Sequence, residues 1–285
     1  MISVDRTLYP FESRWTESTD GRIHYADEGS GNPILFVHGT PTWSLLYRHA
    51  IAKLRNGHRC IAPDFLGHGQ SDRPSTADYR PEAHARRLRE FIEDLDLSGI
   101  TLVVHDFGGP VGLRCLLDLP DRFARVVVSN TWMWPIDDRR LQAVDRFVNS
   151  KLGEFLYLRA NISVNVLLPS LFARRQLLTK ELHGAFKAPF PDAPSRLPLL
   201  TLAKSLKGSS SFYDGLWSQR DILLSKPLHV LWGKRDPSFP LAMERWKEIA
   251  TGRVLELPAA GHFVWEEAAE ESVAFLEHVI KDDRA

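Results

Sequence analysis

The stretch Thr101–Gly109, with the sequence TLVVHDFGG, decides the fold of this chain. Its first four residues form a short, continuous apolar run, which is typical of a strand buried on both faces. Asp106 follows where the strand would end, and Gly108 and Gly109 open a segment with a helical pattern. A strand, a sharp turn that carries one polar residue and a helix together have nucleophile-elbow geometry. The stretch therefore predicts that Asp106 stands at the C-terminal end of a buried parallel strand, where open α/β sheets bind ligands.

Strand and helix patterns alternate on both sides of this stretch. Short apolar runs predict strands at 23–26, 33–37, 59–62, 101–104, 125–128, 228–232 and 254–257. Helical patterns fall at 44–54 (with Ser44 as N-cap), 82–95, 108–119, 241–250 and 266–280. Such alternation predicts an α/β fold, a mostly parallel sheet with helices on both faces.

The pattern changes in the middle of the chain. Residues 136–225 show no strand signal, and segments such as 141–158 and 174–186 have a helical pattern. We expect this part to be an inserted helical cap domain. The core domain would then consist of residues 1–135 and 226–285.

Composition excludes several classes of function. The 285 residues carry 36 Lys and Arg against 36 Asp and Glu, so the net charge is zero and no strong basic excess suggests nucleic-acid binding. No apolar run reaches the roughly 18 residues of a membrane span, and the first ten residues lack a signal-peptide pattern. Cys60 and Cys115 lie in apolar stretches and fit free thiols in a reducing compartment. We expect a cytoplasmic protein without a nucleic-acid or membrane partner. The sequence leaves the oligomeric state open.

Three polar residues follow predicted strands, and their order along the chain indicates a class of enzyme. Asp106, Asp236 and His262 stand in the nucleophile–acid–base order of an α/β-hydrolase. His262 would act as the base, and Asp236 would accept a hydrogen bond from its other ring nitrogen and fix the tautomer. The loop after the predicted strand at 125–128 offers alternatives for the acid, and these stay open at this point: Asn130, Asp137 and Asp138.

An aspartate nucleophile implies a particular chemistry. Its carboxylate is already ionised at neutral pH, so it needs no base to attack. It can displace a leaving group from a saturated carbon and form an alkyl-enzyme ester, which His262 would hydrolyse by activating water. Backbone N–H groups of Thr40 and Phe107 would hold the oxyanion of that second step. We expect neither a metal nor an organic cofactor, because no Gly-x-Gly-x-x-Gly, His-Glu-x-x-His or paired-cysteine motif is present.

Nearly the whole chain resembles one known family. The motifs that carry the resemblance are His38–Trp43 (HGTPTW), Asp64–Ser71 (DFLGHGQS), His105–Gly109 (HDFGG), Gly261–Phe263 (GHF), Leu8–Trp15 (LYPFESRW) and Asn130–Pro135 (NTWMWP). They are similar to those of the haloalkane dehalogenases of the α/β-hydrolase superfamily, and to the third subfamily in particular. The resemblance implies a small apolar electrophilic substrate and water as the reaction partners.

Two residues depart from the family pattern. The family usually holds the departing halide with a Trp directly after the nucleophile and an Asn after His-Gly, where this chain has Phe107 and Thr40. Phenylalanine has no side-chain donor, and the threonine hydroxyl is a donor on a shorter arm. Loss of one such donor costs about 10²–10³-fold in turnover, so dehalogenation would be weak. Trp43, Trp132, Trp134 and Trp217 are candidates to replace the lost donor.

Other readings remain open. An epoxide hydrolase would use two cap tyrosines, for which this chain offers Tyr157 and Tyr213. Some relatives of the third subfamily are β-lactone decarboxylases, and a non-catalytic binding protein is a further alternative. For substrate binding we expect Tyr157 and Tyr213 together with an aromatic lining of Trp43, Phe107, Trp132, Trp134, Phe172, Phe239 and Phe263.

Overall fold

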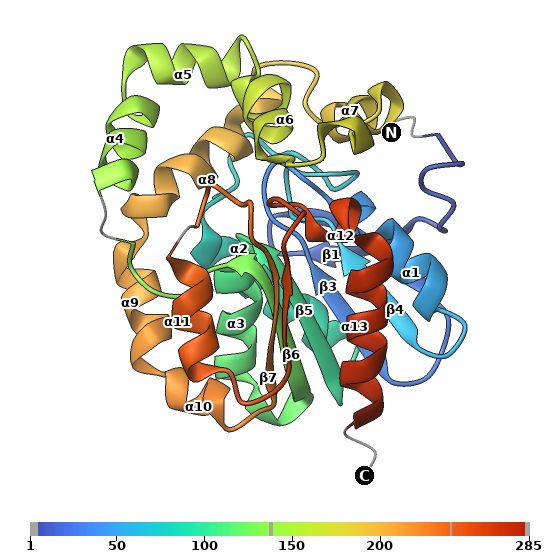
Figure 1. Ribbon diagram of the computed structural model, residues 1–285. Coiled ribbons are helices and arrows are strands. Elements are labelled where there is room, and N and C mark those ends of the chain that lie inside the picture. Colours follow the sequence, from blue (N-terminus) through green and yellow to red (C-terminus); the bar gives the residue numbers. More distant parts are fainter. Residues whose placement is uncertain (1–4, 137–138, 240, 283–285) are drawn as a thin grey trace.

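The computed structural model describes residues 5–136, 139–239 and 241–282 (Figure 1). These residues form an eight-stranded sheet with the order β1-β2-β4-β3-β5-β6-β7-β8. The strands are β1 (Arg14–Ser18), β2 (Gly21–Glu28), β3 (Pro33–Val37), β4 (Arg59–Pro63), β5 (Ile100–Asp106), β6 (Phe123–Thr131), β7 (Leu228–Gly233) and β8 (Val254–Leu257). Strands β3 to β8 run parallel, and β1 and β2 are antiparallel at one edge. The predicted mostly parallel sheet is confirmed.

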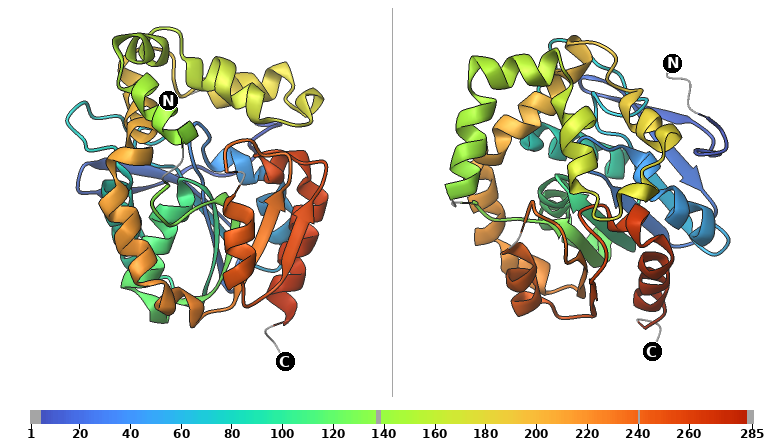
Figure 2. Two further views of the ribbon diagram at one scale, coloured as in Figure 1. Left: turned by 60° about the vertical axis from the view of Figure 1, so that its left-hand side comes forward. Right: turned by 45° about the horizontal axis from the view of Figure 1, so that its top comes forward.

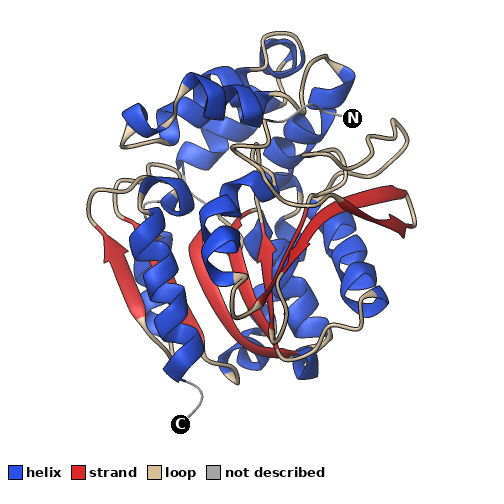
Figure 3. Cartoon of the chain, turned by 90° about the vertical axis from the view of Figure 1, so that its right-hand side faces the viewer, coloured by secondary structure: helices blue, strands red, loops and turns tan. Residues whose placement is uncertain are grey.

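Helices cover both faces of the sheet (Figures 2 and 3). One face is packed by α1 (Arg48–Leu54), α12 (Val264–Glu267) and α13 (Ala269–Asp282), and the other by α2 (Pro81–Asp94), α3 (Gly108–Asp118) and α11 (Ala242–Ile249). The side chains of β3 alternate between the two cores: Leu35 and Val37 join the cluster under α2 and α3, and Ile34 and Phe36 join the one under α1 and α13. This period of two on a fully buried strand explains the continuous apolar run.

The described residues of the segment between β6 and β7 form helices joined by loops and include no strand. Its helices are α4 (Arg139–Val148), α5 (Lys151–Leu158), α6 (Leu168–Leu171), α7 (Lys180–Lys187), α8 (Leu197–Gly208), α9 (Ser210–Ser218) and α10 (Arg220–Leu224), with a π-helical turn at Ser163–Leu167. In Figure 1, α4 to α8 lie over one end of the sheet, and α9 and α10 descend beside α3. The last two helices thus attach the insertion to the core layer.

Several helix predictions were wrong in detail, including the one over 174–186, where a 3₁₀ turn at Arg175–Leu177 precedes α7. The single helix expected over 141–158 is two helices, because the Ser150 side chain accepts a hydrogen bond from Gly153 N–H at 3.0 Å and starts α5. A Cβ at Gly153 would lie 1.9 Å from Phe147 O, so the turn requires glycine there. Ser44 does not cap a helix, because its hydroxyl pairs with the Tyr9 hydroxyl at 2.6 Å and a 3₁₀ turn precedes α1.

None of the helices in the described ranges combines the length and the apolar character that a bilayer crossing requires. Cys60 and Cys115 are buried free thiols. Burial raises the pKa of both thiols, that of Cys60 to about 12.

Candidate active site

Asp106 stands at the sharp turn between β5 and α3. It is the last residue of the strand, its φ is 51°, and α3 begins two residues later at Gly108. The turn is possible because its neighbours lack side chains: a Cβ at Gly39 would lie 2.2 Å from Asp106 Oδ1, and one at Gly108 would lie 2.0 Å from Val37 O. A left-handed φ at a non-glycine residue is uncommon and is often found at functional sites. The structure therefore has the elbow that the sequence predicted.

The Asp106 carboxylate has a defined partner for each oxygen. The backbone N–H of Thr40 donates to Oδ1 at 2.9 Å, and His262 Nε2 lies 3.6 Å from Oδ2. The carboxylate also lies beside the N-terminus of α3, whose free N–H groups and dipole favour a negative charge. Only 7% of the residue is exposed, so the carboxylate is held in place and largely shielded from water.

His262 connects this carboxylate to a second one. Its Nδ1 lies 2.8 Å from Asp236 Oδ2, so Nδ1–H donates there and Nε2 is left facing Asp106. Asp236 also accepts hydrogen bonds from Asn130 Nδ2 at 2.8 Å and from Ser238 N–H at 2.8 Å. Asn130 thus donates to Asp236, and it is Asp236 that contacts the His262 ring.

The other two candidates for the acid, Asp137 and Asp138, lie outside the described residues. No local sequence pattern indicates the bond between Asn130 and Asp236, because the two residues meet only where β6 and β7 end side by side.

The two carboxylates dominate the electrostatics of His262. Burial lowers its pKa, but Asp236 and Asp106 outweigh burial and raise the pKa to about 10. Burial likewise opposes ionisation of Asp236, yet His262 and the hydrogen bonds from Asn130 and Ser238 hold the pKa of Asp236 below its usual value. The resting site is therefore an imidazolium between two carboxylates. Removal of the charge on Asp106 would lower the pKa of His262.

A neighbouring histidine supports the loop that carries His262. His105 Nε2 lies 2.9 Å from the His262 carbonyl oxygen, and the two rings are 4.5 Å apart. Burial and the charge of His262 lower the pKa of His105 to about 3, so His105 is neutral. Because a carbonyl only accepts, Nε2 carries the hydrogen and donates it. His105 therefore holds the loop without competing for protons.

Glu267 is a buried carboxylate that the sequence analysis missed. Its Oε1 accepts from Gly261 N–H at 3.0 Å, directly before His262, and its Oε2 accepts from Arg174 N–H at 2.8 Å in the insertion. The N–H of His262 in turn donates to Leu171 O at 3.1 Å. The loop of the base and the insertion are thus fastened together. The one available signal was a Glu-Glu pair within an otherwise apolar run after Gly-His-Phe.

Several predicted aromatic residues gather around these groups. The Phe263 ring lies 4.9 Å from the His262 ring and 4.7 Å from that of Phe172. Phe239 lies 5.9 Å from His262 on another side. Phe107 and Trp132 are buried, with ring centroids 4.9 Å apart. The apolar environment fits an apolar ligand.

Other predicted residues have their contacts elsewhere. Trp43 Nε1 donates to Ala185 O at 3.2 Å, and Trp134 packs against Trp217 and Trp246. Tyr157 packs in a separate cluster within the insertion, with Val148, Val164, Phe190, Leu199, Leu200 and Ala203.

Tyr213 lies 5.8 Å from Trp132, but its hydroxyl donates to Ser205 O at 3.0 Å. The described residues include no group of three His, Cys, Asp or Glu side chains placed to hold a metal ion.

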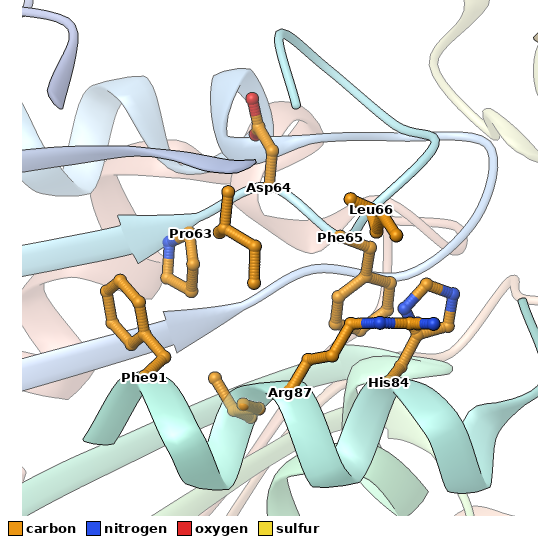
Figure 4. A pocket seen from close by; sticks show the side chains of 9 residues that line it. Pro63, Asp64, Phe65, Leu66, His84, Arg87 and Phe91 are labelled. Atoms are coloured by element: carbon orange, nitrogen blue, oxygen red, sulfur yellow. The ribbon is translucent and has the colours of Figure 1, made fainter. Parts of the chain in front are cut away.

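A small cavity lies away from these groups, between α2 and the end of β4 (Figure 4). It is lined by Ile23, Pro63, Asp64, Phe65, Leu66, His84, Arg87, Leu88 and Phe91. Its free volume is about 10 Å³, which is at most the room for one water molecule, so it is not a substrate site.

Comparisons with known proteins agree with this geometry. Residues 32–269 match the family model described as the alpha/beta hydrolase fold. The chain is 38% identical over 279 residues to haloalkane dehalogenase 2 of Mycobacterium tuberculosis, covering 96% of this chain and 97% of that protein. It is 30% identical over 289 residues to the cis-3-alkyl-4-alkyloxetan-2-one decarboxylase of Shewanella oneidensis, covering 97% and 90%.

Among solved structures, the chain is similar to the haloalkane dehalogenase DatA of Agrobacterium tumefaciens. The TM-score is 0.87 at 25% identity, and the match covers 98% of this chain and 99% of that one. The fold, the elbow and the extent of these matches lead to one conclusion: the chain belongs to the haloalkane dehalogenase family of α/β-hydrolases.

Proposed function

We propose that this enzyme hydrolyses carbon–halogen bonds of small apolar haloalkanes through an ester on Asp106. The observation that carries the proposal is the arrangement around one carboxylate: Thr40 N–H at 2.9 Å, and His262 Nε2 at 3.6 Å with Asp236 behind it at 2.8 Å. Relatives that are named haloalkane dehalogenases support the choice of substrate. The products would be an alcohol and a halide ion.

In the first step an Asp106 oxygen attacks the carbon that bears the halogen. The carbon–oxygen bond forms as the carbon–halogen bond breaks, and the halide leaves with the bonding electrons. No base is needed, so the imidazolium form of His262 is compatible with this step. The buried, apolar surroundings strip water from the carboxylate and strengthen its interactions.

Formation of the ester prepares the second step. The ester is neutral, so His262 loses one of the two charges that raise its pKa and becomes able to accept a proton. It then takes a proton from water, which attacks the ester carbon of Asp106. Asp236 stabilises the imidazolium that results. The Thr40 N–H already bonds Oδ1 and can stabilise the negative charge that develops on that oxygen, together with the N–H of Phe107.

A His262→Ala variant tests the proposal, because without its base the enzyme should accumulate the ester. We would offer a bromoalkane, an epoxide and a β-lactone of similar size, and weigh the intact protein. A mass gain equal to the alkyl group, mapped to Asp106, is the expected result. A gain equal to the whole epoxide would instead indicate an epoxide hydrolase. The absence of any adduct would leave a binding protein.

β-Lactone decarboxylation is a second candidate because of the Shewanella oneidensis relative. A ring-opened lactone keeps its leaving carboxylate attached, so this chemistry makes no use of a separate halide site. The observation in its favour is the absence of the usual donor at Phe107. Release of carbon dioxide and an alkene from the β-lactone, with an adduct of the whole lactone mass on Asp106 and no adduct from the bromoalkane, would establish it.

We also propose that residues 136–225 act as a cap domain over a core of residues 1–135 and 226–285. The contacts of Leu171 and Arg174 with the loop of His262 support this division. A cytoplasmic location is part of the proposal, since Cys60 and Cys115 are buried free thiols.

A further inference from the structure

Trp132 carries a buried hydrogen-bond donor with no partner. The side chain is fully buried, and its Nε1 makes no hydrogen bond. Other buried indoles are paired: Trp43 donates to Ala185 O, Trp246 to Thr131 O and Trp265 to Ser129 Oγ. An unpaired buried N–H lowers stability, so its presence calls for an explanation.

The position of the Trp132 indole explains why its N–H is left unpaired. Trp132 lies between Phe107, at 4.9 Å and nearly perpendicular, and Phe239, at 4.7 Å. Phe107 directly follows the nucleophile, and the Phe239 ring lies 5.9 Å from the ring of His262. The Trp132 ring, which carries the unpaired N–H, thus lies in a row of rings that runs from Phe107 beside Asp106 to His262.

The side-chain donors that the family usually directs at the departing halide are missing beside Asp106. Phe107 offers no side-chain N–H, and the Thr40 hydroxyl already pairs with His68 Nε2 at 3.2 Å. A halide ion released beside Asp106 would lack a side-chain donor there unless another residue supplied one. An apolar wall with a single free N–H is suited to a large, weakly hydrated anion.

We propose that Trp132 Nε1–H is the donor that binds the departing anion, in place of the donor absent at position 107. This inference rests on the proposed function. As the carbon–halogen bond breaks, charge collects on the halogen, and the indole hydrogen bond stabilises it without a proton transfer. A halide ion is therefore the ligand of this site, and bromide or iodide fits better than fluoride, which holds its hydration more strongly.

The test compares Trp132→Phe with Trp15→Phe. Both replace an indole with a phenyl ring, but Trp15 lies on the edge strand β1, where it packs against His24 and Arg22. In the His262→Ala background, we expect Trp132→Phe to slow formation of the ester from a bromoalkane by about 10²-fold or more, and Trp15→Phe to leave that rate nearly unchanged. Chloroalkanes should suffer more than iodoalkanes, because chloride is the poorer leaving group.

A second measurement is independent of catalysis. Calorimetric titration of the full-length enzyme with sodium bromide should show at least about tenfold weaker binding in Trp132→Phe than in the unmodified enzyme. Addition of Phe107→Trp to Trp132→Phe should restore both the rate and the affinity, because it returns a donor to the same place. That rescue also guards against a variant that merely packs poorly.

The outcomes separate the two proposals. If the His262→Ala enzyme forms no ester from any haloalkane, the proposed function fails, and the bromide titration still decides the role of Trp132. If the ester forms and neither its rate nor the bromide affinity responds to Trp132→Phe, the inference is overturned while the function stands.

Discussion

Two regions of the molecule are stabilised by different interactions: the end of the sheet that carries Asp106, and the helical insertion above it. At the sheet end, backbone groups fix the polar side chains: Thr40 N–H binds Asp106, and Ser238 N–H binds Asp236. The insertion has an apolar cluster of its own. Phe155 is 59% exposed, and Tyr157 two residues later is buried in a small cluster of the insertion's own. The difference teaches that the position of the chemistry is set by local backbone geometry, and that of the insertion by contacts between distant residues.

The variant with the largest expected effect tests whether the chemistry lies at the Asp106 turn. Asp106→Asn removes the nucleophile, because a carboxamide does not displace a halide, and turnover should fall by roughly 10⁶-fold. Glu154→Gln is the matched control, since it removes a carboxylate from an exposed position of α5 and should leave turnover unchanged. Halide release, followed with an ion-selective electrode, measures both. Substantial turnover in Asp106→Asn would move the chemistry away from the elbow.

The second largest effect is expected for Asp236→Asn, which should slow ester hydrolysis far more than ester formation. Asp236→Asn removes the acceptor of His262 Nδ1–H at 2.8 Å, so the ring loses its preferred tautomer and its stabilising charge. Ester hydrolysis should slow by about 10⁴-fold, while ester formation is far less affected. Rapid-quench mass spectrometry would show the alkylated enzyme accumulating.

The control for that variant is Asn130→Asp combined with Asp236→Asn. It moves the carboxylate by one hydrogen bond, because Asn130 Nδ2 lies 2.8 Å from Asp236 Oδ2. Partial recovery would show that charge near the ring is what counts. Wild-type hydrolysis in Asp236→Asn alone would contradict the role of Asp236.

An effect of intermediate size is expected in the pH dependence of ester hydrolysis compared with that of ester formation. In the free enzyme the pKa of His262 is raised to about 10, and alkylation removes the contribution of Asp106, so the pKa falls in the ester. Only neutral His262 activates water, and ester hydrolysis should therefore slow about tenfold per pH unit below that lowered pKa. Ester formation should stay level over the same range, because that step does not require neutral His262. Single-turnover kinetics test this, and parallel profiles for the two steps would contradict it.

The smallest effect concerns the insertion. Tyr213→Phe loses one hydrogen bond, from the hydroxyl to Ser205 O at 3.0 Å, and should lower the free energy of unfolding by about 1 kcal/mol. Turnover of a bromoalkane should change by less than about twofold, a barrier change of roughly 0.4 kcal/mol. Tyr157→Phe should behave likewise. A selective loss of diol formation from an epoxide in either variant would favour the epoxide hydrolase alternative.

The sequence predicted the residues that follow strand ends and missed those that depend on packing. Asp106, Asp236 and His262 could be placed because parallel strands end at one edge, so local spacing along the chain translates into proximity. Trp43 and Trp134 also lie next to motif residues, yet the ring of Trp43 packs against Tyr9 and the ring of Trp134 packs against Trp217 and Trp246. Adjacency in sequence does not determine the direction in which a loop side chain points.

Glu267 and the break at Ser150 required contacts that no local pattern encodes. The partner of Glu267 lies 93 residues away at Arg174, and Ser150 interrupts a helical pattern that is otherwise continuous. Local periodicity records which face of an element is apolar, but not which distant backbone N–H a buried carboxylate will meet.

The hydrogen bond between Glu267 and the insertion limits which segments could replace residues 136–225 during evolution. The Glu267 carboxylate accepts from Gly261 N–H, beside His262, and from Arg174 N–H in the insertion. If residues 136–225 were exchanged for an unrelated segment, Asp106 would stay in place, but the buried Glu267 carboxylate would lose its Arg174 N–H donor unless the new segment supplied another. Recombination in such a gene is therefore restricted by a contact outside the Asp106, Asp236 and His262 set.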